Sequence, residues 1–174
     1  MTGPTMTPAT PARPVIAPPS QPATLLREGI AQRIPHQGRM CLLDQLLHWT
    51  DRQIDCSATS HTAADNPLRS ARGLLAPCAI EYAAQAMALH GALTAPAGVQ
   101  AGPGYLASVR EVRLSVLRLD DIAGALQVRA QRLAGDASLV SYAFCVADAS
   151  GRLLADGRAT VVLNSPLPRP CGLT

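Results

Sequence analysis

One acidic residue, Glu81, lies in a long stretch of the chain that otherwise carries no charge. Between Arg72 and Arg110 no other Asp, Glu, Lys or Arg occurs. Because an ionised carboxylate is costly to bury without a partner, Glu81 must be hydrogen-bonded, protonated or exposed to a cavity. Perturbed carboxylates of this kind gather at functional sites, which makes Glu81 a candidate catalytic residue. The alternative is a carboxylate at a sheet edge or subunit interface that pairs with an arginine.

Two polar side chains on the same predicted helix are placed near Glu81. Gln85 follows it by four residues, the spacing that brings two side chains to one face of a helix, so its amide is expected to orient the carboxylate. Cys78 lies at the helix start, where a thiolate is stabilised and can act as a nucleophile. No second motif supports nucleophilic catalysis, and apolar surroundings favour the neutral thiol.

The four histidines fall into two classes. His61 ends a predicted strand, and because an imidazole titrates near neutral pH it is the candidate base. Alternatively, it is a loop histidine that hydrogen-bonds Asp65 or caps the turn. His36 lies in a loop shortly before a glycine and is expected to pack near the mouth of a substrate tunnel. His48 and His90 are expected to be structural.

The elements that must position these residues are two strands, one long helix and four further strands. The runs 40–49 and 53–60 predict a hairpin, and Pro77, at a first helical position, opens a helix that reaches about residue 93. Further strands are expected at 105–117, 125–133, 139–147 and 152–163. The helix is apolar almost all round, and a curved antiparallel sheet wrapped around it would cover it most economically. This pattern predicts an α+β hotdog fold, in which an edge strand commonly pairs across a dimer.

Length and composition exclude several classes of function. The 174 residues can form one domain, and 48% hydrophobic with 16% charged residues is a globular balance. Aromatic residues make up only 3%, so few side chains are present on which nucleic acid bases could stack. The net charge of +3, with arginine as the only basic residue type, falls short of the footprint of a DNA-binding protein.

The cysteines indicate the redox compartment of the protein, and the composition of the two chain ends indicates the limits of its domain. The five cysteines are widely spaced without a C-x-x-C pair, which argues against a metal site or a disulfide framework and favours the reducing cytoplasm. The stretch 74–95 is too weakly apolar to span a membrane. We expect a disordered Pro/Ala/Thr-rich leader over residues 1–24, one domain over 25–164 and a flexible tail over 165–174.

The motifs around the candidate residues resemble those of bacterial 3-hydroxyacyl-acyl-carrier-protein dehydratases. Residues 80–86, IEYAAQA, are similar to the I-E-x-x-A-Q-A helix of these enzymes, and residues 35–44, PHQGRMCLLD, resemble their P-H-R-x-P-x-L-L-x-D motif. Residues 105–109, YLASV, resemble the strand after the helix. The divergent branch found in aryl polyene pigment clusters is the most similar, through SHTAADNPL at 60–68. The resemblance covers about 33–163.

This resemblance implies dehydration of a 3-hydroxyacyl thioester to the trans-2-enoyl thioester, in aryl polyene or fatty-acid-like biosynthesis. No metal or organic cofactor is implied, because the elimination requires only a positioned base, a positioned acid and polarisation of the carbonyl. The substrate is carried on the phosphopantetheine arm of an acyl carrier protein. Glu81 matches the family glutamate that protonates the departing hydroxyl. In these relatives a loop histidine works across the dimer interface and removes the proton beside the carbonyl, which backbone N–H groups near the helix start polarise.

The partners implied are the acyl carrier protein and a second hotdog subunit, in a homodimer or a heterodimer. Five arginines on or beside neighbouring predicted strands could meet the acidic carrier and its phosphate, or could simply form a solvated face: Arg110, Arg113, Arg118, Arg129 and Arg132.

The sequence departs from the family pattern at two places. Asn66 occupies the histidine position, and an amide cannot act as a base near neutral pH. Either His61 takes that role, or the chain is an impaired subunit that partners a complete dehydratase. The family's Met-Pro-Gly element is replaced by Leu-Leu-Ala at 74–76, which leaves the backbone N–H of Ala76 or Cys78 as the carbonyl clamp. A hotdog acyl thioesterase, which also uses a helix carboxylate, is a third alternative.

Overall fold

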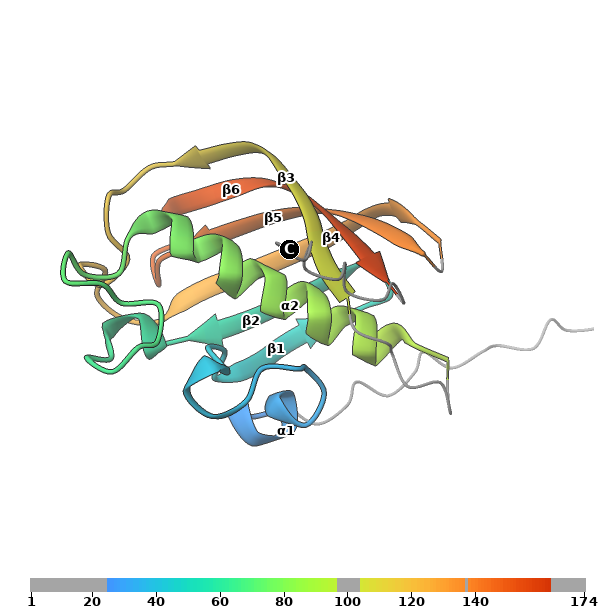
Figure 1. Cartoon of the computed structure of the whole chain (residues 1–174), viewed down its shortest axis with the longest axis horizontal. Helices are drawn as coiled ribbons and strands as arrows, with labels where there is room; N and C mark the ends of the chain where they lie inside the picture. Colours follow the sequence, from blue (N-terminus) through green and yellow to red (C-terminus); the bar gives the residue numbers. More distant parts are fainter. Residues whose placement is uncertain (1–24, 97–103, 137, 164–174) are drawn as a thin grey trace, which may run out of the picture.

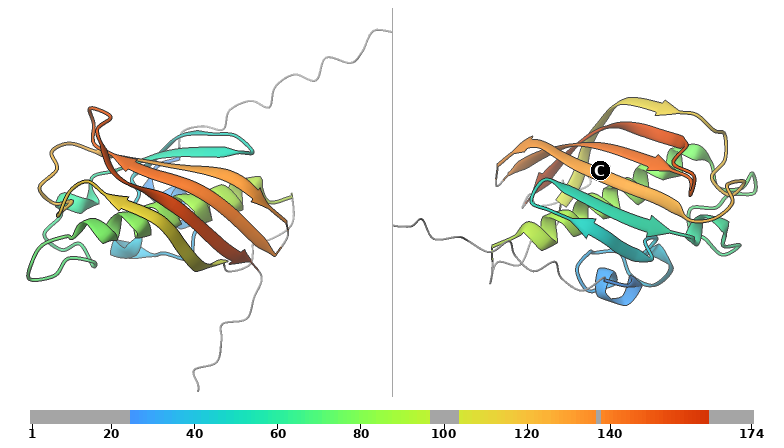
Figure 2. Two further views of the ribbon diagram at one scale, coloured as in Figure 1. Left: turned by 90° about the horizontal axis from the view of Figure 1, so that it is seen from above. Right: turned by 180° about the vertical axis from the view of Figure 1, so that it is seen from behind.

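The computed structural model describes residues 25–96, 104–136 and 138–163. In this part of the chain one long helix, α2, lies across the concave side of a single curved sheet (Figure 1). The two further views show the sheet wrapping around this helix (Figure 2). The predicted hotdog architecture is therefore confirmed. The expected leader over 1–24 and the tail over 165–174 lie outside the described residues.

The sheet has six antiparallel strands in the order β1-β2-β4-β5-β6-β3. The strands are β1 (Gln45–Trp49), β2 (Gln53–Ala58), β3 (Gly104–Leu114), β4 (Leu126–Gly135), β5 (Leu139–Ala147) and β6 (Leu153–Leu163). In β4 the apolar residues Leu126, Val128 and Ala130 are buried and the residues between them are exposed, as expected when one face of a strand packs on the core. β3 forms one edge of the sheet.

The helix α2 (Ala79–Thr94) is entered through a 3₁₀ turn over Ala76–Cys78 that contains Pro77. Its alanine-rich sequence has a high intrinsic helix propensity. The helix ends where Ala95 becomes extended before Pro96, because the proline ring disfavours the helical conformation in the preceding residue. In the described residues, no helix has both the length and the apolar character needed to cross a membrane.

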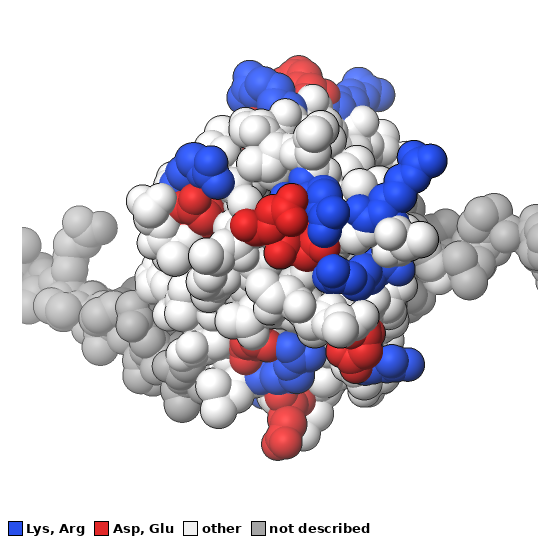
Figure 3. All heavy atoms as spheres, turned by 90° about the vertical axis from the view of Figure 1, so that its left-hand side faces the viewer, with Lys and Arg blue, Asp and Glu red and all other residues white. Residues whose placement is uncertain are grey.

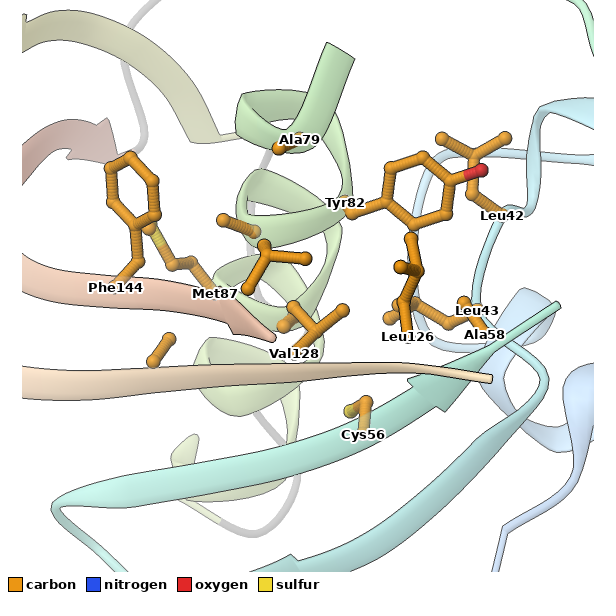
Figure 4. Close-up of a cluster of buried hydrophobic side chains, with 14 of the residues drawn as sticks. Leu42, Leu43, Cys56, Ala58, Ala79, Tyr82, Met87, Leu126, Val128 and Phe144 are labelled. Carbon is orange, nitrogen blue, oxygen red and sulfur yellow. The ribbon is translucent and has the colours of Figure 1, made fainter. Parts of the chain in front are cut away.

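The core fills the space between α2 and the sheet. Figure 4 shows Tyr82 and Met87 from α2 among side chains of β2, β4 and β5. Tyr82 is fully buried and also packs toward the segment that carries Leu42 and Leu43. His90 makes buried polar contacts in this core: its Nδ1 is 2.9 Å from Tyr142 Oη, and its Nε2 is 2.8 Å from the carbonyl of Thr50. His90 is therefore structural in this fold.

The first predicted strand begins later than the sequence pattern indicates. A 3₁₀ turn over Gly38–Met40 replaces its start, and Gly38 adopts a positive φ of 57° that only glycine tolerates easily. In residues 40–42 the backbone hydrogen-bonds to the side chain of Gln85 in α2 and not to a neighbouring strand. Met40 C=O accepts a hydrogen bond from Gln85 Nε2, and Leu42 N–H donates a hydrogen bond to Gln85 Oε1. Strand pairing in β1 begins only at Gln45.

Candidate active site

Glu81 is the third residue of α2 and its side chain is 31% exposed. One carboxylate oxygen, Oε1, accepts a hydrogen bond from Gln85 Nε2 at 2.9 Å, and His36 Nε2 lies 3.1 Å from the same oxygen. Within the described residues the other oxygen, Oε2, has no hydrogen-bond partner. Glu81 is thus a half-buried carboxylate with one oxygen held and the other free.

Gln85 is fully buried and completely hydrogen-bonded. Its Nε2 donates to Met40 C=O at 2.8 Å and to Glu81, which uses both amide hydrogens. Its Oε1 accepts the N–H of Leu42 at 2.9 Å. Turning the amide over would lose the bond to Leu42, so the amide must present a donor to Glu81. The i,i+4 spacing predicts the contact with Glu81, whereas the bonds to residues 40 and 42 come from the fold.

His36 lies in a loop that is anchored on both sides. Before it, Ile34 is buried and its N–H donates to the carbonyl of Ile30 at 3.2 Å, beside the short helix α1 (Arg27–Ala31). After it, the side chain of Gln37 donates to the carbonyls of Ala31 and Ile34. The backbone on both sides of His36 is therefore held in place, and this places the imidazole beside Glu81. Its Nδ1 is buried without a hydrogen-bond partner within the described residues.

These contacts decide the ionisation of Glu81. Burial is the largest single influence and raises its pKa, but the hydrogen bonds from His36 and Gln85 together outweigh burial. The pKa of Glu81 therefore lies below its ordinary value, and the side chain is a carboxylate at neutral pH. A group in this state accepts a proton before it can donate one.

His61, the candidate base, is fully buried in a 3₁₀ turn over Ser60–Thr62. Its Nε2 donates to the carbonyl of Ile122 at 3.1 Å, and its Nδ1 is enclosed without a partner among the described residues. Burial lowers the pKa of His61, so the imidazole is neutral near pH 7. The structure does not bring His61 into hydrogen-bond contact with Glu81.

Asn66 lies in a buried hydrogen-bond network and is only 6% exposed. Its Nδ2 donates to the carbonyl of Ser60 at 2.8 Å and to Tyr82 Oη at 3.1 Å, and its Oδ1 accepts the N–H of Leu68 at 2.9 Å. Ser60 Oγ lies 2.9 Å from Tyr82 Oη and donates to Leu42 C=O. Asn66 therefore ties the loop that carries it to α2, with its amide fully occupied.

The proposed carbonyl clamp at the helix start is engaged elsewhere in this structure. The N–H of Ala76 donates to Leu117 C=O at 2.9 Å, and the N–H of Cys78 donates to Leu75 C=O at 3.0 Å. The Cys78 thiol points to the carbonyl of Leu68 at 3.9 Å, and burial raises its pKa. The thiol is therefore neutral at pH 7, as expected in apolar surroundings.

Of the five arginines that could meet the carrier or form a solvated face, three pair with carboxylates: Arg113 with Asp156, Arg118 with Asp120 and Arg129 with Asp55. Positive and negative side chains likewise lie side by side on the face seen in Figure 3. Arg113 and Arg129 border a hollow of about 470 Å³ over β4, β5 and β6, which is also lined by Ala143, Cys145 and Gly157. This hollow does not include Glu81.

The residue that meets Glu81 is not the histidine that the sequence suggests as the base. His36 is part of the motif at 35–44 and was predicted to lie near a tunnel mouth, without a contact to Glu81. The only sequence indication of this contact is that both motifs belong to the same family pattern. The number of residues between the two motifs does not predict which loop lies next to the start of the helix.

Comparisons with known proteins agree with the fold. A family model described as ApeP-like, ApeP dehydratase, matches residues 28–168. The chain is similar to the dehydratase heterocomplex ApeI:P from Xenorhabdus doucetiae, with a TM-score of 0.70 and 23% identity over 78% of this chain and 91% of that one. It is also similar to a thioesterase from Haemophilus influenzae, with a TM-score of 0.58 and 13% identity over 84% and 95%. At these identities the solved structures establish the fold alone. A search of curated proteins finds no match.

Proposed function

The chain belongs to the ApeP-like dehydratase family, and we propose that it removes water from a 3-hydroxyacyl thioester to form the trans-2-enoyl thioester. The acyl chain is carried on the phosphopantetheine arm of an acyl carrier protein. The reaction needs a group that takes the proton beside the thioester carbonyl and a proton for the departing hydroxyl. It needs no redox chemistry, so positioned side chains are sufficient.

The observation that supports this proposal is the state of Glu81. Oε1 is held by Gln85 and His36, while Oε2 has no partner within the described residues and the side chain is partly exposed. A carboxylate fixed on one oxygen and free on the other is preorganised for proton transfer, because little reorganisation remains to be done during the reaction. The site is carried by α2, a helix in which no residue is fully exposed.

We propose that a second hotdog subunit completes the site along β3. This edge strand carries exposed apolar side chains at Leu106, Val112 and Leu114. Unpaired strand edges with apolar residues favour pairing with another chain. The similar structure from Xenorhabdus doucetiae is a heterocomplex of two dehydratase subunits, which supports a partner of this kind here.

A second candidate function is that of a subunit with little activity of its own. Two observations favour it: the amide of Asn66 occupies the position of the family histidine, and His61 is fully buried away from Glu81. In that case the partner subunit supplies the remaining catalytic group. A thioesterase remains as the third candidate, and it differs in releasing a free thiol.

Enoyl thioester formation from a 3-hydroxyacyl-carrier protein tests these functions. The protein is assayed alone and with a partner hotdog dehydratase, and Glu81→Gln is compared with the unchanged chain in each case. We expect Glu81→Gln to lower the rate by about 10²–10⁴-fold, the usual contribution of an acid–base group, while the assembly stays intact.

Activity of the chain alone contradicts the role of an impaired subunit. Activity only in the mixture, insensitive to Glu81→Gln, shows that the partner does the chemistry. Thiol release without enoyl product identifies a thioesterase instead.

A further inference from the structure

One row of side chains crosses the face of the sheet that is turned away from α2. In β5 alternate residues such as Phe144 and Val146 are buried against the core, and Cys145 between them is only partly covered. The strand registers place Cys145 opposite Arg129 of β4 on one side and opposite Asp156 of β6 on the other. The row is therefore centred on β5, the strand in the middle of β2, β4, β5, β6 and β3.

The charges in this row follow an antisymmetric order. From β2 to β3 the registers line up Asp55, Arg129, Cys145, Asp156 and Arg113. Asp55 pairs with Arg129, and Asp156 pairs with Arg113. The signs are thus negative, positive, neutral, negative and positive. When the row is reversed end to end, every charged position receives the opposite sign.

The middle of the row is hollowed. Arg113 and Arg129 border the hollow of about 470 Å³ described above, and Ala143 and Cys145 of β5 contribute only small side chains to it. Sheets that pack face to face lie about 10 Å apart, and small side chains in the middle allow a second sheet to approach this closely. The shape of this face is therefore compatible with a second sheet.

The two arginines in the row retain donors for a further carboxylate. Arg129 has a side chain that is 57% exposed, and within the described residues it hydrogen-bonds Asp55 through Nε alone. Arg113 has a side chain that is 77% exposed and uses Nε and Nη2 on Asp156. A guanidinium carries five N–H hydrogens, so both groups can bond a second carboxylate without releasing the first.

The balance of charge favours a second copy of this chain over an acidic or a basic partner. An acidic carrier protein placed on this row would meet as many negative side chains as positive ones. In a two-fold contact, by contrast, each residue meets a different residue of the other copy. An axis along β5 sets every charge opposite an unlike charge, whereas an axis along the row itself sets each charge opposite its own copy.

We propose that this face binds the same face of a second copy of the chain, about a two-fold axis that runs along β5 through Cys145. Arg129 then pairs with Asp156 of the second copy, and Arg113 pairs with Asp55 of the second copy. Because twisted sheets cross at about 30° when they pack, the pairs nearest the axis, between Arg129 and Asp156, are the closest ones. The contact goes beyond the proposed function and does not use the backbone edge of β3.

Exchanging the two members of one ion pair tests this arrangement. Asp55→Arg/Arg129→Asp and Arg113→Asp/Asp156→Arg each keep an ion pair within the chain, so both variants should fold, which circular dichroism checks. Each exchange makes the row symmetric, so that like charges face each other between two identical variants. Unlike charges face each other when the two variants are mixed. All forms carry Leu106→Glu, so that association along β3 does not contribute.

We expect light scattering to report twice the mass of one chain for the unchanged row and a single chain for each exchange variant alone. The equimolar mixture of the two variants, and a variant with all four substitutions, should again give twice that mass. Association of the separate exchange variants equal to that of the unchanged row overturns the inference, and so does a single-chain mass for the unchanged row. In the latter case, loss of binding to another hotdog subunit in the exchange variants assigns this face to that subunit instead.

Cross-linking tests the position of the axis. Cys145 lies on the axis, so a short bis-maleimide should join the Cys145 thiols of two copies. The other cysteines are buried, as are Cys41 and Cys56, or are replaced by serine in this experiment, Cys78 and Cys171. In Cys145→Ser/Gln131→Cys the thiol is moved to the neighbouring strand β4, and the cross-linked dimer should be lost. Equal cross-linking from both positions contradicts an axis along β5.

Discussion

The buried histidines of this protein differ in how their nitrogens are satisfied. Both nitrogens of His90 are hydrogen-bonded, to Tyr142 and Thr50, whereas His61 has one partner, Ile122, and an enclosed Nδ1. In each case burial lowers the pKa from the ordinary value of 6.5. Protonating either ring would bury a charge, so the folded protein resists it while the unfolded chain does not.

At the residue scale we therefore predict that stability falls when the pH drops below about 6.5. Below that value the unfolded chain binds protons that folded His61 and His90 do not, so the free energy of unfolding decreases until the folded pKa values are reached. Urea unfolding between pH 7.5 and 5.5 measures this slope. His90→Gln should flatten it, while His48→Gln, at a half-exposed position, should preserve it. An unchanged slope in His90→Gln would refute the assignment.

The start of α2 is held by the loop before it and the segment after β3. Asp120, 2% exposed at its side chain, accepts Arg118 and Arg69, and its Oδ1 accepts the N–H of Leu74 at 3.1 Å. The hydrogen bond from Arg118 is the main cause that holds the pKa of Asp120 at about 2. Leu74 C=O in turn accepts the N–H of Leu119. This arrangement positions the helix that carries Glu81.

At the element scale, Gly73→Ala should loosen this arrangement. Gly73 has a φ of +91°, and a Cβ there would lie 2.6 Å from the guanidinium of Arg118 and 2.7 Å from the carboxylate of Asp120. Gly151→Ala is the matched control, because Gly151 has a φ of +87° but open space around it. Backbone strain costs about 1–3 kcal/mol at such a position, so both variants should lose that much free energy of unfolding. Only Gly73→Ala should lose more; equal losses would show that the Arg118–Asp120 contact adapts at no cost.

Within residues 25–96, 104–136 and 138–163, β3 forms a long edge of the sheet. Most of β3 is exposed, and Glu111 within it has a φ of 55°, an uncommon conformation that coincides with an irregular register against β6. The helix that carries Glu81 packs against β2, β4 and β5, so a partner paired along β3 would extend the same sheet that encloses this helix. The proposed subunit pairing therefore links assembly with activity.

At the scale of the whole molecule, we predict that Leu106→Glu prevents pairing with a second hotdog subunit. Leu106 is 40% exposed on the edge strand, and a charge there would be buried in the interface without a partner. Leu133→Glu serves as the control, because Leu133 is 46% exposed but lies on β4, which is not an edge strand. Light scattering of the mixed subunits measures the complex. Equal complex formation by both variants would contradict pairing along β3.

The regular elements and their order could be predicted from the sequence alone. Alternating apolar residues indicate the buried face of β2, β4 and β5, and an alanine-rich apolar run after Pro77 specifies the buried helix, because these signals repeat within a few residues. The Glu81–Gln85 contact is local in the same sense. The start of β1 was placed too early, since the bonds from Gln85 to residues 40 and 42 are made across the fold.

Only the tertiary structure decided which histidine reaches Glu81. The sequence favoured His61, whose loop position suggests accessibility, but the fold buries that ring against Ile122 and brings His36 to the carboxylate. Contacts between residues far apart in the chain depend on how loops close over the core, and no local periodicity encodes them. The sequence determines the chemical type of each side chain. Its protonation state depends on the burial and the hydrogen-bond partners that the side chain acquires when the chain folds.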